Sequence, residues 1–146
     1  MAGEKTERDV ITIVYHYMTK PIMKKIFLLL GSLFAFFGVA LGAFGAHGLK
    51  QFLPPESLVT FETAVRYQMY HAFAILIVAL LADQYPRMAV AGRLFGIGIL
   101  LFSGSLYVMS TTGIRSFGFI TPIGGFCFLA GWWIFFFTAL KIKKEN

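Results

Sequence analysis

Residues 26–46 read IFLLLGSLFAFFGVALGAFGA, a run of 21 residues that carries no charge and has Ser32 as its one polar side chain. The hydrocarbon core of a bilayer is about 30 Å thick, so a helix that rises about 1.5 Å per residue needs about 20 apolar residues to cross it. Residues 94–114 and 116–140 are uncharged runs of the same kind. Residues 63–82 are long enough as well, although three polar side chains lie near their start. The sequence therefore predicts a polytopic membrane protein.

The composition agrees with a membrane environment. Hydrophobic residues make up 58% of the chain and charged residues 14%, whereas a soluble domain has about 25% charged residues. The single Cys127 excludes a disulfide within the chain and metal sites built from paired cysteines. We expect an all-α membrane protein that forms a four-transmembrane-helix bundle. Its spans are expected at about residues 26–47, 61–82, 91–112 and 117–140, within a membrane domain of residues 24–146.

The Lys and Arg residues predict the orientation of the chain. Ten of the 13 fall before the first span, around the loop between the second and third spans, or after the fourth. The opposite side would carry Lys50, Arg66 and Arg115. Because short cytoplasmic segments are enriched in Lys and Arg, we expect a multi-pass protein of the cell inner membrane with both termini cytoplasmic (N-in/C-in). The basic residues are spread over separate short segments, so the expected partner is the lipid bilayer and not a nucleic acid.

Residues 1–23 form a separate region before the first span. Residues 10–18 are mostly apolar but too few to cross a bilayer, and no signal-peptide cleavage site with small residues follows them. One interpretation is a cytoplasmic N-terminal extension that is disordered or lies at the membrane surface. The other is a misassigned start codon, because Met18 and Met23 both lie close to the basic cluster that precedes the first span.

The first span carries small residues at intervals of three and four, which place them on one helical face. Helices in lipid associate through close packing, and a face of small residues lets two backbones approach each other. We expect this face to pack against another span of the same chain or, alternatively, against a second copy. The helix-packing residues are Gly31, Ala35, Gly38, Gly42 and Gly45.

The fourth span contains a proline and two adjacent tryptophans. Pro122 lacks a backbone N–H group, so we expect it to bend this helix. Trp132 and Trp133 lie inside the apolar run, where we expect them to face lipid or a neighbouring helix.

Polar side chains within the expected spans gather in the outer half of the bundle. On the second span, Tyr67 and His71 are four residues apart and Gln68 lies three before His71, so all three follow one helical face. Because polar groups in a membrane must find partners, we expect a buried polar network that faces the bundle interior. The candidate polar cluster, with a structural or a ligand-binding role, consists of His47, Arg66, Tyr67, Gln68, His71, Ser103, Ser105, Tyr107 and Thr121.

Three interpretations of this cluster are open. Its hydrogen bonds can hold the helices together, it can form a small-solute or ion site that opens to the outer face, or His47 and His71 can hold a metal or haem. The third interpretation has two imidazoles but neither a cysteine nor an in-span carboxylate beside them. We therefore expect no metal site and no cofactor.

The sequence shows no nucleophile at a readable spacing from a base and no phosphate-binding loop. Loops of about 5 to 15 residues leave little room for an active site outside the membrane. We therefore expect a non-enzymatic membrane component or assembly partner, which acts as a homo-oligomer or with another membrane protein. The alternative is a carrier or channel with a site around His47, Gln68 and His71.

Four motifs occur in order along the chain. Residues 42–49 read GAFGAHGL, residues 61–72 read FETAVRYQMYHA, residues 101–107 read LFSGSLY and residues 121–125 read TPIGG. Together they resemble a family of small bacterial inner-membrane proteins, the domain of unknown function 423 family, which has transmembrane protein 256-like relatives in eukaryotes. The resemblance covers about residues 24–142. It implies a four-span integral membrane protein, and it implies no particular activity.

Overall fold

The computed structural model describes the backbone of residues 2–142 and the side chains of residues 22–142. The helices are α1 (Ala2–His47), α2 (Pro55–Leu81), α3 (Arg87–Gly98), α4 (Gly104–Thr112) and α5 (Thr121–Ala139). A π-helical segment, η2 (Ile99–Ser103), joins α3 to α4, and 3-10 turns lie at η1 (Leu49–Gln51) and η3 (Arg115–Phe119). Within the described chain, four stretches are long and apolar enough to cross a membrane: Ile22–Gln51, Pro55–Leu81, Arg87–Thr112 and Arg115–Ala139. The predicted all-α bundle of four spans is confirmed.

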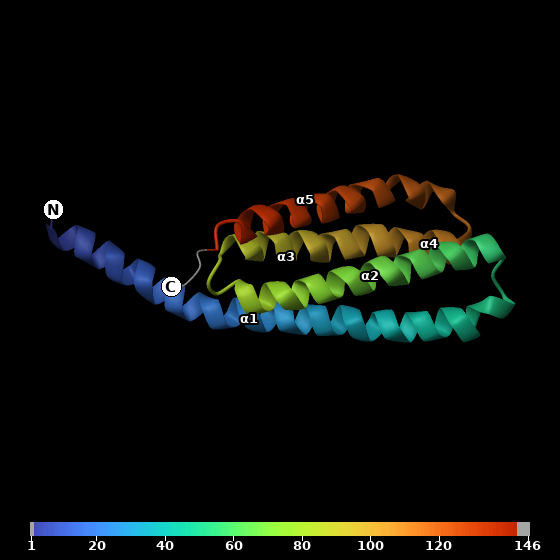
Figure 1. Ribbon diagram of the computed structural model, residues 1–146, viewed down its shortest axis with the longest axis horizontal. Helices are drawn as coiled ribbons and strands as arrows, with labels where there is room; N and C mark the ends of the chain where they lie inside the picture. The colour runs from blue at the N-terminus through green and yellow to red at the C-terminus, as the bar shows by residue number, and fades with distance from the viewer. Residues whose placement is uncertain (1, 143–146) are drawn as a thin grey trace.

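The spans lie side by side in the order α1, α2, third span, α5 (Figure 1). The third span, formed by α3, η2 and α4, packs against α2 on one side and against α5 on the other. The α2 helix and the third span therefore occupy the middle of the bundle. We call the end that carries the 82–86 loop the terminal end, because the first part of α1 extends beyond the bundle there (Figure 1). The end that carries η1 and η3 is the distal end.

The small-residue face of α1 lies against α2. Gly31, Gly38 and Gly45 are buried, and the other two members of the face are half-buried. A Cβ on Gly45 would lie 2.9 Å from the ring of Phe61, and one on Gly38 would overlap the sulfur of Met69. Side chains of α2 therefore occupy the space that a Cβ would take at these positions, as expected for a face of small residues that packs closely against a neighbouring helix.

The apolar core lies toward the terminal end, where α2, α3 and α5 meet. Small residues on α2 and α3 let larger side chains interdigitate between them. The outer faces of α1 and α5 instead expose large apolar side chains such as Phe36 and Trp133, each 67% exposed. Such faces suit lipid and not water. The core residues are Phe27, Ala74, Ile75, Val78, Ala79, Ala82, Met88, Ala91, Phe95, Ile99 and Phe128.

Pro122 begins a helix and does not bend one. The α5 helix starts at Thr121, so Pro122 lies in its first turn, where backbone N–H groups have no partner within the helix. The prediction of a bend is wrong because the uncharged run 116–140 begins within the η3 turn (Arg115–Phe119), and α5 begins only after that turn. Hydropathy alone does not separate that turn from the helix that follows it.

Candidate functional site

Gln68 connects α2 to two other spans. Its Nε2 donates a hydrogen bond of 2.8 Å to the backbone carbonyl of Phe34 on α1. Its Oε1 accepts a hydrogen bond of 3.0 Å from the hydroxyl of Tyr107 on α4. The side chain is 4% exposed. Both ends of the buried amide are therefore satisfied inside the bundle, as burial of a polar group demands.

His71 connects α2 to α5. Its Nδ1 lies 2.8 Å from the carbonyl oxygen of Tyr67, and its Nε2 lies 3.1 Å from Nε1 of Trp132. The carbonyl can only accept and the indole N–H can only donate, so this network assigns the ring proton to Nδ1. The imidazole also stacks on Phe128, with ring centroids 3.4 Å apart and planes 7° from parallel. His71 is thus held by two hydrogen bonds and an aromatic face.

Ser105 and Thr121 join α4 to α5 next to the π-helical segment. Their hydroxyl oxygens are 2.7 Å apart. Ser105 donates its own proton to the carbonyl of Phe102 at 2.9 Å, so Thr121 donates in the bond between the two hydroxyls. A Cβ on Gly124 would lie 2.8 Å from Cα of Phe102. The α5 helix therefore passes directly over the backbone of η2.

Segment η2 is unusual in the third span. Single π-helical turns inside α-helices are rare and occur frequently at functional sites. Ser103, the last residue of η2, is fully buried, and its Oγ has no hydrogen-bond partner among the described residues. Within the described chain, Oδ1 of Asp83 is the other buried side-chain oxygen without a partner. The cluster therefore contains one unsatisfied hydroxyl beside a network that is otherwise paired.

The structure does not bring all the predicted residues together. His47 and Arg66 are exposed. Gly45 packs on Phe61, and His71 lies ten residues further along α2, a distance of about 15 Å at 1.5 Å per residue. The two imidazoles of the proposed metal or haem site therefore do not face each other. Among the described residues, no group of three or more His, Cys, Asp or Glu side chains could hold a metal ion.

Trp132, which is outside the predicted cluster, and Tyr67, which belongs to it, have roles that sequence reasoning did not predict. Trp132 donates a hydrogen bond to His71, whereas the sequence predicted only that its side chain faces lipid or a neighbouring helix. The signal that could have identified it is the indole N–H, which seeks a partner when buried. Tyr67 contributes its backbone carbonyl, while its ring is 38% exposed and lies 4.6 Å from that of Phe102.

The network also lies nearer the middle of the bundle than expected. Gln68 is the fourteenth of the 27 residues of α2, because this helix begins at Pro55, six residues before the expected span. Proline favours the first turn of a helix, and Glu56 in that turn complements its positive end. Because of these local signals, the helix begins earlier than its hydropathy predicts.

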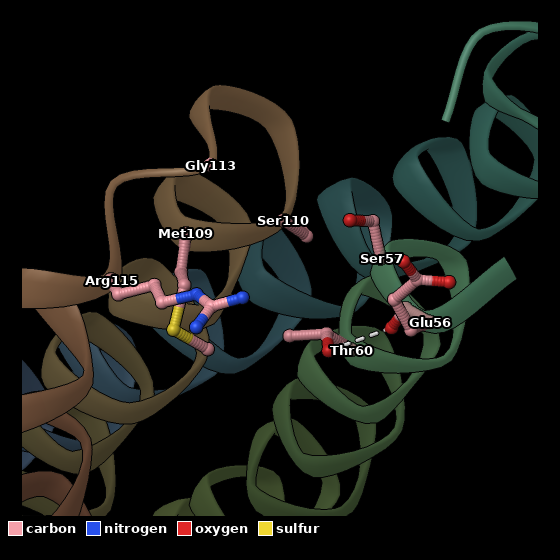
Figure 2. Close-up of a pocket in the computed structure, with 7 residues that line it drawn as sticks. All are labelled: Glu56, Ser57, Thr60, Met109, Ser110, Gly113 and Arg115. Atoms are coloured by element: carbon pink, nitrogen blue, oxygen red, sulfur yellow. Dashed lines mark hydrogen bonds between the residues drawn. The ribbon is translucent and has the colours of Figure 1, made fainter. Parts of the chain in front are cut away.

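An open pocket of about 390 Å³ lies at the distal end, between the start of α2 and the end of α4 (Figure 2). Arg115 extends toward the wall that carries Glu56 (Figure 2), so the pocket has an acidic and a basic side chain on opposite sides. Ser110 lines the pocket and donates a hydrogen bond to the backbone carbonyl of Tyr107, whose hydroxyl binds Gln68. The lining residues are Glu56, Ser57, Thr60, Met109, Ser110, Gly113 and Arg115.

Comparison with known proteins identifies relatives over most of the chain. The family described as "Protein of unknown function (DUF423)" matches residues 41–125. The UPF0382 membrane protein YwdK of Bacillus subtilis is 45% identical over 80% of this chain and 98% of its own length. The UPF0382 inner membrane protein YgdD of Escherichia coli is 34% identical over 82% of this chain and 92% of its own. No solved structure matches the chain. This four-span membrane protein belongs to the DUF423 family.

Proposed function

We propose that the protein is a non-enzymatic component of the cell inner membrane, in which the polar cluster holds the four spans in one arrangement. The supporting observation is the set of partners of Gln68 and His71. Their hydrogen bonds reach α1, α4 and α5, so the two side chains link α2 to every other span. A ligand would have to compete with these bonds, because each nitrogen and oxygen of the two side chains has a partner in the described chain.

The short connections favour an assembly role over catalysis. Residues 52–54, 82–86 and 113–114 are the longest non-helical stretches between the helical elements of the described chain. Such loops offer little room for an active site outside the membrane. A partner, either a second copy or another membrane protein, would meet the apolar outer faces of α1 and α5. Packing of helices from different chains on such faces follows the same rules as packing within the bundle.

Native mass spectrometry of the protein in its own lipids tests this proposal. We expect a homo-oligomer or a co-purifying membrane protein, and no small molecule that depends on the cluster. His71→Ala and Gln68→Ala should weaken the assembly, because they release α2 from its neighbours. Arg66→Ala, at an exposed position on the same helix, is the control. A small molecule that binds reproducibly and is lost from His71→Ala alone would contradict the proposal.

The proposed orientation has both termini in the cytoplasm. The terminal end of the bundle carries more basic residues than the distal end, which favours a cytoplasmic terminal end. In a Cys127→Ser background, Lys50→Cys should react with a membrane-impermeant maleimide in intact cells. Lys141→Cys should react only after the membrane is opened. The reverse pattern would show that the orientation is wrong.

A second candidate function is binding or transport of a small solute from the distal side. The observation that favours it is the pocket of about 390 Å³ with Glu56 and Arg115 on opposite walls (Figure 2). Opposite charges on two walls suit a solute that carries both signs. A bound solute that is lost from Glu56→Gln and kept by Glu62→Gln, an exposed acid outside this pocket, would favour this candidate.

A further inference from the structure

An apolar groove of about 490 Å³ lies between α1 and α3. It extends along α1 from Met23 to Phe34, which is about 16 Å at 1.5 Å per residue. This length matches about half of the 30 Å hydrocarbon core, the depth of one lipid leaflet. The walls are formed chiefly by Met23, Leu30 and Phe34 of α1, by Gly92 and Gly96 of α3, and by Leu100 of η2.

Gly96 deepens this groove without serving the packing of the chain. A Cβ on Gly96 would meet nothing within 4 Å in the described part of the protein. A Cβ on Gly92, one turn earlier, would lie 2.7 Å from the ring of Phe27. Close packing between α1 and α3 therefore accounts for Gly92 but not for Gly96, although glycine is unfavourable inside a helix. The space beside Gly96 is open to a molecule outside the chain.

A positive charge lies in the wall of the same groove. Arg93 lines it and lies on one helical face with Gly96 and Leu100, at spacings of three and four. It is the seventh residue of α3, about 9 Å from the start of that helix. Its side chain is exposed, and an arginine near the end of a span needs a counter-charge or access to the interface. Among the described residues that line the groove, none is acidic.

We propose that this groove binds an acyl chain of an anionic phospholipid, and that Arg93 donates hydrogen bonds to the phosphate. The guanidinium group matches a phosphate in charge and geometry. Lys24 and Lys25 directly follow Met23, where the groove begins on α1, and make this end of the bundle positive. The site is thus apolar over the depth of one leaflet and cationic where a head group would lie.

A second copy of the chain is the competing occupant. An open glycine on a span can admit the backbone of another helix. A symmetric contact through the α3 face would, however, bring Arg93 close to the same residue of the second copy. Like charges in a low-dielectric environment repel each other strongly. The charge therefore favours a lipid.

Lipid retention by the full-length protein tests the inference, independently of the polar cluster. The protein is reconstituted in nanodiscs of equal phosphatidylglycerol and phosphatidylcholine, and native mass spectrometry reports the lipids that stay bound. We expect wild type to retain phosphatidylglycerol preferentially. Arg93→Gln should reduce this preference about fivefold, the factor expected for one basic residue at an anionic surface. Gly96→Leu should fill the groove and reduce retention of both lipids.

Two matched variants serve as controls. Arg115→Gln removes a charge at the distal end. Gly104→Leu adds a side chain outside the groove, at a glycine whose Cβ would also meet nothing in the described chain. Both should retain lipid as wild type does. Equal retention of the two lipids by wild type, or the same loss in Arg115→Gln as in Arg93→Gln, would overturn the inference. A lipid-free dimer of wild type that Gly96→Leu dissociates would also overturn the inference. If Gly96→Leu does not fold, the lipid preference of Arg93→Gln alone decides whether the inference holds.

Discussion

Replacement of Gln68 by leucine removes the connection between α2 and two other spans while it keeps a side chain of similar size. Two hydrogen bonds are lost, one to the carbonyl of Phe34 and one from the hydroxyl of Tyr107. Hydrogen bonds between helices in a membrane contribute about 0.6 kcal/mol on average and about 1.7 kcal/mol at most. We therefore expect Gln68→Leu to lower the free energy of unfolding by about 1–3 kcal/mol.

Reversible unfolding in mixed lipid and sodium dodecyl sulfate micelles, followed by tryptophan fluorescence, measures this change. A double-mutant cycle with Tyr107→Phe isolates the bond between the two side chains. Its coupling energy should be about 0.6–1.7 kcal/mol. Tyr70→Phe is the control, because Tyr70 lies on the same helix but is 58% exposed. Its effect should add to that of Gln68→Leu within about 0.3 kcal/mol.

Two results would refute the reasoning. A coupling between Gln68 and Tyr107 that is no larger than the coupling to Tyr70 would show that the hydrogen bond does not hold α2 to α4. A Gln68→Leu variant as stable as wild type would show that the buried amide is not needed for the arrangement of the spans. Either result would also weaken the proposed structural role of the cluster.

Two further comparisons test the packing of α5. Trp132→Phe keeps an aromatic ring but removes the N–H donor to His71. It should lower the free energy of unfolding by about 0.6–1.7 kcal/mol. In the same unfolding assay, an equal loss from Trp133→Phe, at an exposed position, would contradict this expectation. Gly124→Ala should destabilise by about 1–3 kcal/mol, because its Cβ would meet the backbone of Phe102. Gly104→Ala should stabilise by up to about 1 kcal/mol, since its Cβ meets nothing in the described chain. Similar effects of the two alanines would show that α5 does not pass closely over η2.

The polar face of α2 could be predicted from spacing alone, but the partners of that face could not. Gln68 and His71 share a face because they are three residues apart on a helix. Which atoms they bind depends on which spans lie beside α2 and how those spans are rotated. One partner is the backbone carbonyl of Phe34, which has no signature in the sequence. His47 belongs to the same pattern of polar residues, yet it ends α1 at an exposed position.

The boundaries of the helices also depend partly on local sequence and partly on tertiary contacts. Pro55 and Pro122 both lie in the first turn of a helix, and neither bends one. The stop after Thr112 has a local cause, since Gly113 adopts the left-handed conformation with φ of 73°. Segment η2 has no such local cause that we can identify. It lies where Gly124 of α5 meets the backbone of the third span.

The sequence by itself determined that four apolar segments cross a membrane, because the length and hydropathy of a span depend on the bilayer and not on the other spans. It also determined which face of α1 is small enough for close packing. Only the tertiary structure decided that this face meets α2, that Trp132 completes the polar cluster, and that Gly96 and Arg93 border a groove with no protein filling. These features depend on distances between segments far apart in the chain, which no local pattern specifies.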